Sequence, residues 1–368
     1  MKLHLITIII ILSILSYLCF SQDNYELFSN FNSDCVPPDL LEKAMSEVGI
    51  KQKQNKDDWE YYIPCEYDTC EAKVKEFETE KTKRKLFLIE GCDVLASKLT
   101  LWEVLKKHFK NNANNIMPKT FLLHNEEDMN DFLEHYYTLQ YKKKNHMFIL
   151  KNYAQRQEGL KLSTDLDDIL DSKNKGFYIV QDYLYNPFLI SKRKINFRYY
   201  TLIICKEGNV SGFIHRSGFV YYTPEFYEED SIDFNRHITT GYIDRKVYDT
   251  NPLTLDDFRN HLDGIESGLS TTWDENVRNL MNKVVDALAP NICKNEKLYN
   301  HLRFQLFGSD VAPTSDLKAY LMEINKGPDL DAKDEKDKKV KLSVQVDMLK
   351  LIENNGILSK DINFEKIY

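Results

Sequence analysis

The feature that most constrains this chain is a predicted β-hairpin toward its C-terminal end. Two runs with alternating apolar and polar residues, FQLFGSDV and AYLMEIN, flank the segment APTSDLK, which carries a proline and an aspartate for turning. If the hairpin closes symmetrically around this turn, Asp310 lies roughly opposite Glu323. A side-chain period of two places Glu323 and Asn325 on one face of the second strand, and Met322 and Ile324 on the other.

Two facing carboxylates repel each other, so a protein keeps them only with compensation. A set of two acids and one amide offers only oxygen ligands, which suits Mg²⁺, since this ion takes a few carboxylates together with waters and substrate phosphates. Asp310, Glu323 and Asn325 are therefore candidate ligands for one or two Mg²⁺ ions. The alternative is an acidic hairpin edge that faces solvent.

Several segments resemble one known family in the order in which they occur. The patterns F-x-x-x-G-x-D and L-x-E-x-N in FQLFGSDV…DLKAYLMEINKGPDL are similar to the metal-binding end of ATP-grasp ligases, and the wider string resembles the tubulin–tyrosine ligase-like family. Upstream, FILKNYAQRQEGL, GFYIVQDYLYNPFLI, KINFRYYTLII and HITT resemble further family segments, and KLFLIEGCDVLASKLTLWEVL with MPKTFLL is a weaker match. The resemblance spans roughly residues 85–330 and implies an α/β fold (α+β layers) of the ATP-grasp type with a smaller N-terminal α/β domain.

The resemblance also implies roles for individual residues around a bound ATP. Those expected to contact the nucleotide are Lys151 on the α- and β-phosphates, Arg156 and Gly159 in the phosphate loop, Gln181, Tyr183 and Leu184 around adenine, Lys194 beside the nucleotide, Asn196 on the ribose side, Arg198 on the γ-phosphate, and His237 and Thr239 near the ribose. Arg198 and Glu323 are the expected catalytic residues. Period two independently places Lys194, Asn196 and Arg198 on one strand face. That pattern alone fits a solvated sheet face equally well, just as Lys151, His237 and Thr239 alone fit surface positions.

Three positions depart from the family pattern. Asn196 stands where the family usually has Asp, and Thr240 stands in place of the usual Asn. The family's second γ-phosphate Arg should fall at or near Tyr221, while Arg216 lies on the same predicted hairpin but out of register. Each loss is expected to weaken catalysis, because a charged donor to a developing oxyanion contributes roughly 3 kcal/mol.

The implied activity is that of an ATP-dependent carboxylate–amine ligase that adds a free amino acid to a protein or peptide through an acyl-phosphate. The formal net charge of −8 provides no basic field for nucleic acid or for the acidic tails of tubulin, so tubulin is a candidate acceptor but not the favoured one. One alternative is a nucleotide-binding pseudoenzyme of the same fold. The other is an ATP-grasp ligase that acts on a non-tubulin acceptor in a secretory or membrane setting.

The N-terminal segment 1–21 predicts such a setting. An apolar stretch runs from Leu5 to Phe20, with Lys2 before it and acidic residues after it. Its length fits the core of a signal peptide, an uncleaved signal anchor that holds the protein to a membrane, or a buried helix. For the first two readings the charge bias puts the remaining chain on the lumenal or external side, hence secreted or membrane-anchored. If the segment is not a signal, the chain is expected to be cytoplasmic.

The cysteines and one sequon bear on the same question. Six cysteines follow the apolar stretch, an even number that is compatible with disulfides. Cys65 and Cys70 are a candidate local bridge, whereas Cys92, Cys205 and Cys293 lie in apolar surroundings in which free core thiols are common. The segment GNVSG, residues 208–212, contains one N-x-S sequon that is usable only after translocation.

Alternating strand and helix patterns organise the rest of the chain. The patterns predict helices over 98–109 and 126–141, a helix beginning at Thr164 or Asp165, and another over 344–358, with strands in KLFLIEG, MPKTFLL and MFILK. This alternation favours α/β layers. The predicted division is an N-terminal α/β domain over 22–117, a central ATP-grasp subdomain over 118–192, and a C-terminal ATP-grasp subdomain over 193–368 that contains the metal-binding hairpin 301–330.

Overall fold

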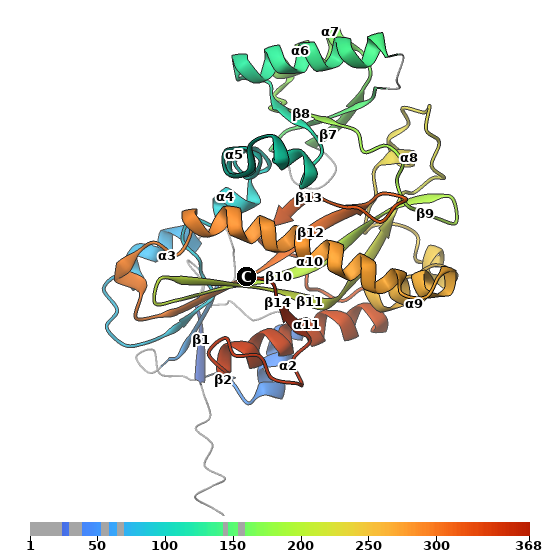
Figure 1. Ribbon diagram of the computed structural model, residues 1–368. Helices are drawn as coiled ribbons and strands as arrows, with labels where there is room; N and C mark the ends of the chain where they lie inside the picture. The colour runs from blue at the N-terminus through green and yellow to red at the C-terminus, as the bar shows by residue number, and fades with distance from the viewer. Residues whose placement is uncertain (1–23, 29–38, 53–58, 65–69, 143–145, 154–158) are drawn as a thin grey trace, which may run out of the picture.

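The protein is built on two β-sheets, a long main sheet and a small second sheet at one end (Figure 1). A computed structural model describes residues 24–28, 39–52, 59–64, 70–142, 146–153 and 159–368, without the side chains of 24–28, 51–52, 64 and 70–73. Helices lie on both faces of the main sheet (Figure 1). The mixed α/β layering predicted from the sequence is therefore confirmed.

The main sheet joins strands from both ends of the chain. Its order is β14-β11-β10-β12-β4-β3-β1-β2, with β13 paired to β12 and β9 to β10. The N-terminal strands pair in parallel, and β4 joins them to β12. The strands are β1 (Asn24–Phe28), β2 (Lys51–Gln52), β3 (Tyr61–Pro64), β4 (Lys85–Leu86), β9 (Leu189–Ile190), β10 (Arg193–Lys206), β11 (Asn209–Tyr222), β12 (Leu302–Pro313), β13 (Ala319–Asn325) and β14 (Phe364–Lys366).

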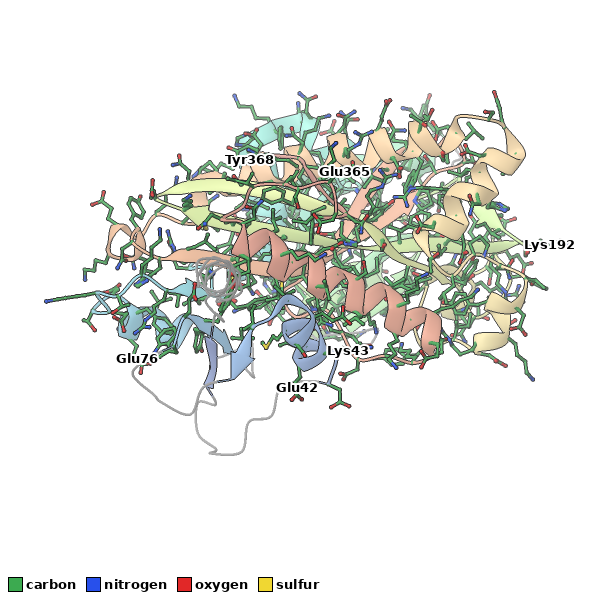
Figure 2. All side chains as sticks on the ribbon, turned by 90° about the horizontal axis from the view of Figure 1, so that it is seen from below. Glu42, Lys43, Glu76, Lys192, Glu365 and Tyr368 are labelled. Atoms are coloured by element: carbon green, nitrogen blue, oxygen red, sulfur yellow. A yellow bond between two sulfur atoms is a disulfide. The ribbon has the colours of Figure 1, made fainter. Side chains whose placement is uncertain are left out.

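Two layers of helices bury the two faces of this sheet. Helices α9 and α10 cover one face, while α11 and α2 cover the other, which Figure 2 shows from below with Glu42 and Lys43 on α2. Apolar residues at i, i+3 and i+4 spacing explain why α10 buries one side, as in Trp273, Val277 and Leu280. The helices are α2 (Asp39–Val48), α3 (Cys70–Phe77), α4 (Asp93–Ala96), α5 (Lys98–Phe109), α6 (Glu126–Tyr141), α7 (Leu166–Asp171), α8 (Phe234–His237), α9 (Leu255–Ile265), α10 (Leu269–Leu288) and α11 (Glu335–Glu353).

The small sheet has its own apolar core. Its order is β5-β8-β6-β7, and α6 and α7 pack on it. Its strands are β5 (Thr120–Leu122), β6 (Phe148–Lys151), β7 (Leu160–Ser163) and β8 (Ile179–Asp182). The predicted division at 117/118 and 192/193 stays a prediction, since the strands of 24–86 and of 193–366 share the main sheet and β9, before residue 192, already pairs with β10.

Local sequence signals located several elements correctly. Helices α5 and α6 have the bounds that were predicted, and Asp165 rather than Thr164 caps α7 by accepting a hydrogen bond from the Asp168 backbone N–H. The predicted strand KLFLIEG is wrong beyond Leu86, since β4 ends there. The charged run before the last predicted helix is helical itself, because α11 begins at Glu335 behind an Asp334 cap.

The prediction for two of the cysteines is wrong. Cys205 and Cys293 form a disulfide with a Cα–Cα distance of 5.8 Å, because the end of β10 meets the loop that follows α10. Cys92 is buried in the same core and takes no part in this bridge. The suggested bridge from Cys65 lies outside the described residues, as does the apolar stretch near the N-terminus. Within the described ranges, no helix has the length and apolar character needed to cross a membrane.

Candidate active site

The hairpin of β12 and β13 brings the candidate metal ligands together. Asp310 pairs with Glu323 and Gly308 pairs with Asn325, which is the register that the sequence predicted. The pairing shifts directly after Asp310, where Val311 opposes Leu321. Met322 is thus the extra residue of a β-bulge, which breaks the simple alternation expected around it.

Arg198 completes the charge balance of this hairpin from the neighbouring strand. It lies opposite Asp310 in the β10–β12 pairing, and its Nε and Nη2 atoms donate to Asp310 Oδ1 and Oδ2 at 2.5 and 3.1 Å. Gly308 makes room for this side chain, because a Cβ there would lie 3.0 Å from Arg198 Cδ and 3.0 Å from Pro328 Cβ. The glycine of the sequence motif therefore has a packing role beside the ion pair.

Acidic and basic side chains are buried together in this cluster. The pKa of Asp310 is raised to about 6: burial is the largest cause of the increase, Arg198 opposes it, and the facing Glu323 adds to it. Burial lowers the pKa of Arg198, but the charge of Asp310 outweighs this and keeps it raised. Within the described ranges, no cluster of three or more His, Cys, Asp or Glu side chains forms a metal site. The two acids and the Asn325 amide, whose Nδ2 lies 3.4 Å from Glu323 Oε1, are an all-oxygen donor set that fits Mg²⁺.

The neighbouring Asn196 adds a polar atom to the same face. Ile195, Phe197 and Tyr199 of β10 pack in the apolar core, so Lys194, Asn196 and Arg198 share the opposite face as predicted. Asn196 Oδ1 is buried, and among the described residues no donor lies within hydrogen-bonding distance of it. A buried acceptor without a donor is costly, and a bound ligand with a hydroxyl or amine group would relieve that cost.

Lys151 reaches the hairpin from the small sheet. It is the last residue of β6, and its Nζ donates to the backbone O of Met322 at 3.3 Å. The β-bulge thus exposes a carbonyl that a regular strand would use in pairing. The pKa of Lys151 is lowered to about 8, because the effect of burial outweighs the opposing charge of Glu323. The two sheets therefore meet at this buried lysine.

Sequence reasoning missed Lys98, which the fold places at the same site. Lys98 is the first residue of α5, and its Nζ lies 3.9 Å from Glu323 Oε2. Its charge is also one of the causes that lower the pKa of Lys151. The sequence carried a signal only in the weak N-terminal family match that contains KLTLW, and that match assigned no role to the lysine.

A series of hydrogen-bonded side chains lies near Lys151. Lys194 Nζ donates to Tyr183 Oη at 3.2 Å, and Tyr183 Oη lies 2.8 Å from His237 Nδ1. His237 Nε2 lies 2.7 Å from the backbone O of Ser231, which requires the proton on Nε2 and leaves Nδ1 to accept from Tyr183. The pKa of Lys194 is lowered to about 7, mainly by burial and also by the charge of Lys151.

The remaining predicted nucleotide contacts are mostly buried. Gln181 is buried in β8 and donates to Thr120 Oγ1 at 2.7 Å, while the Tyr183 backbone N–H donates to Met147 O at 3.0 Å. Gly159 is buried and accepts from Asn152 through its backbone O. Leu184 is buried and Thr239 is half-buried. Arg156 lies outside the described residues, and the nucleotide roles of this set stay predictions.

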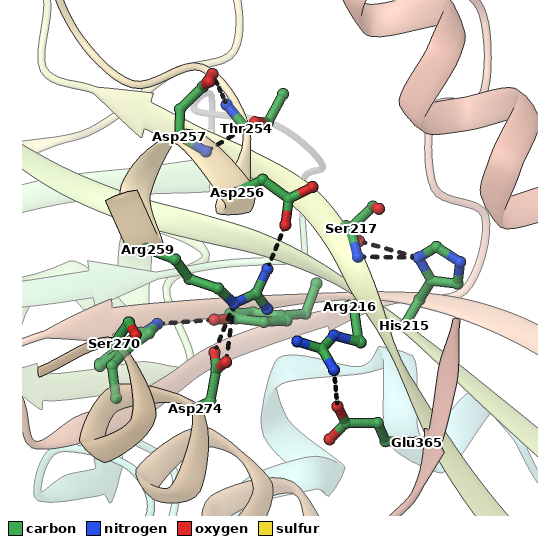
Figure 3. A network of polar contacts seen from close by, with 12 residues as sticks. His215, Arg216, Ser217, Thr254, Asp256, Asp257, Arg259, Ser270, Asp274 and Glu365 are labelled. Carbon is green, nitrogen blue, oxygen red and sulfur yellow. Dashed lines mark hydrogen bonds and ion pairs between the residues drawn. The ribbon is translucent and has the colours of Figure 1, made fainter. Parts of the chain in front are cut away.

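The departures noted in the sequence lie beside Arg198. Tyr221 pairs with Asn196 across β10 and β11, and its ring centre is 5.6 Å from the Arg198 guanidinium. Burial raises the pKa of Tyr221 to about 12. Arg216 is out of register, as expected: it forms an ion pair with Glu365 of β14 at 3.3 Å, and Figure 3 shows it directed toward that residue. Thr240 uses its backbone N–H to bond Tyr222 O.

The fold and the site together define a class of protein. Two sheets meet at buried lysines, and an acidic hairpin lies beside an arginine, which is consistent with an ATP-grasp-like α/β fold. The model of the tubulin-tyrosine ligase family matches residues 78–360, so the chain belongs to that family.

Curated relatives agree with this membership. The chain is 25% identical over 354 residues to a Homo sapiens protein named probable tubulin polyglutamylase TTLL2, covering 89% of this chain and 56% of that protein. It is 28% identical over 199 residues to tubulin glycylase 3B of Drosophila melanogaster, covering 50% of this chain and 26% of that protein. A Caenorhabditis elegans protein named probable tubulin polyglutamylase ttll-9 is 25% identical over 258 residues, with 65% and 58% covered. The chain thus spans about a quarter to under three fifths of the length of these relatives.

Proposed function

We propose that this chain is an ATP-dependent carboxylate–amine ligase that joins a free amino acid to a protein or peptide. The observation that carries the proposal is the convergence of Lys151, Arg198 and the Asp310–Glu323 pair, from two sheets and three separate segments, in one buried polar cluster. Burying several charges is costly unless a ligand or partner compensates them. A polyphosphate with Mg²⁺ has the charge pattern that these residues match.

The proposed reaction needs no nucleophilic side chain. A carboxylate oxygen of one substrate attacks the γ-phosphorus of ATP, ADP leaves, and an acyl-phosphate forms; an amine then attacks the acyl carbon, releases phosphate, and loses a proton as the amide forms. Asp310, Glu323 and Asn325 would hold one or two Mg²⁺, which when bound draw charge from the phosphate oxygens. The main contribution of the protein is positioning.

The cationic side chains of the cluster lie on two sides of the acidic pair. Lys151 and Lys98 lie on the Glu323 side, while Arg198 lies against Asp310, so phosphate oxygens bound between them would meet charge from both sides. The planar guanidinium of Arg198 suits two-point contact with a phosphoryl group. In the absence of nucleotide, its ion pair with Asp310 holds the side chain in place.

A second candidate function is a nucleotide-binding pseudoenzyme. Tyr221 and Asn196 favour it, because they pair with each other beside Arg198 where the family pattern has further charges. Neither candidate function identifies the acceptor. Since the relatives are named as tubulin-modifying enzymes, tubulin is one acceptor to test, beside peptides with free carboxylates or amines.

The first experiment is thermal unfolding of residues 22–368 with and without Mg²⁺ and ATP, beside Glu323→Gln. Ligand at about 100 times its dissociation constant should add roughly 2.7 kcal/mol and raise the midpoint by several degrees. We expect a Mg²⁺-dependent shift that Glu323→Gln abolishes, followed by phosphate release when amino acid and acceptor are added. A shift without turnover on any acceptor supports the pseudoenzyme, and no shift at millimolar ATP contradicts both candidates.

A further inference from the structure

The end of the β10–β11 hairpin farthest from the candidate active site carries two unusual features. The strands are joined by Glu207 and Gly208, both with positive φ (51° and 79°), as in a tight two-residue turn. Cys205 pairs with Val210 and Lys206 pairs with Asn209 in the last two positions. One face of this hairpin end therefore carries a cysteine, and the other carries an asparagine.

The cysteine side joins the hairpin to a distant segment. Cys205 and Cys293 are both fully buried in the core beneath the main sheet and form a disulfide across a sequence separation of 88 residues. Their Cα–Cα distance of 5.8 Å is typical of native disulfides. Cys92 lies in the same core cluster and takes no part in this bridge.

The asparagine side presents a modification sequon to solvent. Asn209 is exposed, and Val210 and Ser211 complete the N-x-S pattern. Its Nδ2 makes one long hydrogen bond, 3.4 Å to the backbone O of Glu207. Because side chains alternate along a strand, Asn209 projects from the face opposite to Cys205, and a group attached to it would not displace the core.

We propose that the folded part of this chain matures in an oxidising, glycosylating compartment, with the Cys205–Cys293 disulfide formed and an N-linked glycan on Asn209. Persistent disulfides are rare in reducing compartments, and a sequon is used only after translocation, so the two features require the same side of a membrane. The apolar stretch from Leu5 to Phe20 independently predicts such translocation. The inference does not depend on ligase activity.

Both covalent steps have ordinary chemistry. The two thiols lose two electrons and two protons to the disulfide of an oxidoreductase, which becomes a dithiol. The Asn209 amide nitrogen attacks the anomeric carbon of a lipid-pyrophosphate-linked oligosaccharide, loses one proton, and releases the lipid pyrophosphate. From Arg198 to the end of β10 is 8 residues, or roughly 26 Å at 3.3 Å per residue, so the glycan would lie far from the candidate active site.

The proposal also selects the class of acceptor. A ligase in this compartment would modify lumenal or extracellular proteins or peptides rather than cytosolic tubulin. This consequence rests on the proposed function, whereas the disulfide and the glycan are tested without any activity measurement.

The experiment uses the full chain with its own N-terminus, expressed in a eukaryotic cell that has a working secretory pathway. Thiols are alkylated in denaturant before and after reduction, and peptides are identified by mass spectrometry. We expect the Cys205 and Cys293 peptides to be linked before reduction, and we expect Cys92→Ala to retain the link. A peptide-N-glycosidase should lower the mass of the chain, and Asn209→Gln or Ser211→Ala should abolish that shift.

Either of two results overturns the proposal. One is alkylation of Cys205 and Cys293 without prior reduction. The other is a chain whose mass does not respond to the glycosidase or whose response survives Asn209→Gln. The disulfide and the glycan are both measured on the wild-type chain, so a variant that fails to fold does not obscure the result.

Discussion

Restoring a charge at position 221 tests directly whether the cluster around Arg198 binds phosphate. Tyr221→Arg places a second guanidinium beside Arg198, whose own guanidinium lies 5.6 Å from the centre of the tyrosine ring. Two like charges at that separation repel by about 3 kcal/mol at an effective dielectric constant of about 20. Asp310 offsets part of this repulsion, so we expect the variant without nucleotide to lose about 1–3 kcal/mol of unfolding free energy.

Bound ATP should reverse the sign of that effect. One additional fixed cationic donor to a developing phosphoryl charge is worth about 3 kcal/mol, or on the order of a hundredfold in rate. We therefore expect Tyr221→Arg to show a larger Mg-ATP shift of the unfolding midpoint than wild type and a faster release of inorganic phosphate. Both quantities can be measured on the same preparation, by calorimetry and by a phosphate assay.

The matched control is Tyr221→Leu, which removes the ring without adding a charge. It should show no gain with ATP, and the double variant Tyr221→Arg with Glu323→Gln should lose the gain if it arises at this site. If the Arg and Leu variants respond to Mg-ATP equally, Tyr221 does not face the phosphates, and its assignment to the missing arginine position is refuted.

Three further predictions concern stability. The pKa of Lys194 is lowered from 10.5 to about 7, mainly by burial. Between these pH values the unfolded chain binds a proton that the folded chain lacks, so the free energy of unfolding should rise with pH, by at most about 5 kcal/mol in total. Lys194→Met should flatten this rise in urea titrations at pH 7, 8 and 9, and parallel profiles would contradict the assignment. Cys293→Ala opens the Cys205–Cys293 bridge, which closes a sequence separation of 88 residues, and should cost about 4–5 kcal/mol of unfolding free energy by loop-closure entropy. Cys92→Ala, which leaves that bridge intact, should cost far less, and equal costs in denaturant unfolding would rule out the bridge. Gly308→Ala puts a Cβ 3.0 Å from two neighbouring side chains and should lower the free energy of unfolding by about 1–3 kcal/mol. Gly264→Ala lies in a helix with no atom within 4 Å of the new Cβ, so it should raise the stability slightly. Unfolding midpoints that shift in the same direction for both variants would contradict this prediction.

The parts of the site that sequence reasoning located depend on local regularities. The Asp310–Glu323 register follows from a period of two and a turn of defined composition, both readable within one short segment. The polar face of Lys194, Asn196 and Arg198 follows from the same period. Helices α5 and α6 begin at side-chain caps, Ser97 and Asn125, that precede a helical pattern.

Other parts were not predictable because they depend on contacts between distant segments. Lys98 lies near Glu323 only because α5 packs against the hairpin. The Met322 carbonyl at the bulge accepts a hydrogen bond only because the fold brings Lys151 to it from the other sheet. The helices α9 and α10 carry no chemical motif, so the sequence reading did not place them. The disulfide joins cysteines whose apolar neighbours gave each the pattern of an isolated core thiol.

The sequence by itself determined the fold class, the register of the acidic hairpin and the family resemblance, since strand period, turn chemistry and helix caps act over a few residues. Only the tertiary structure decided which charges share the buried cluster and how they alter one another. Arg198 lies 112 residues from Asp310 in the chain, yet the two form an ion pair. Burial and Coulomb interactions depend on distance in space, and for residues so far apart in sequence that distance is set by the packing of the whole fold.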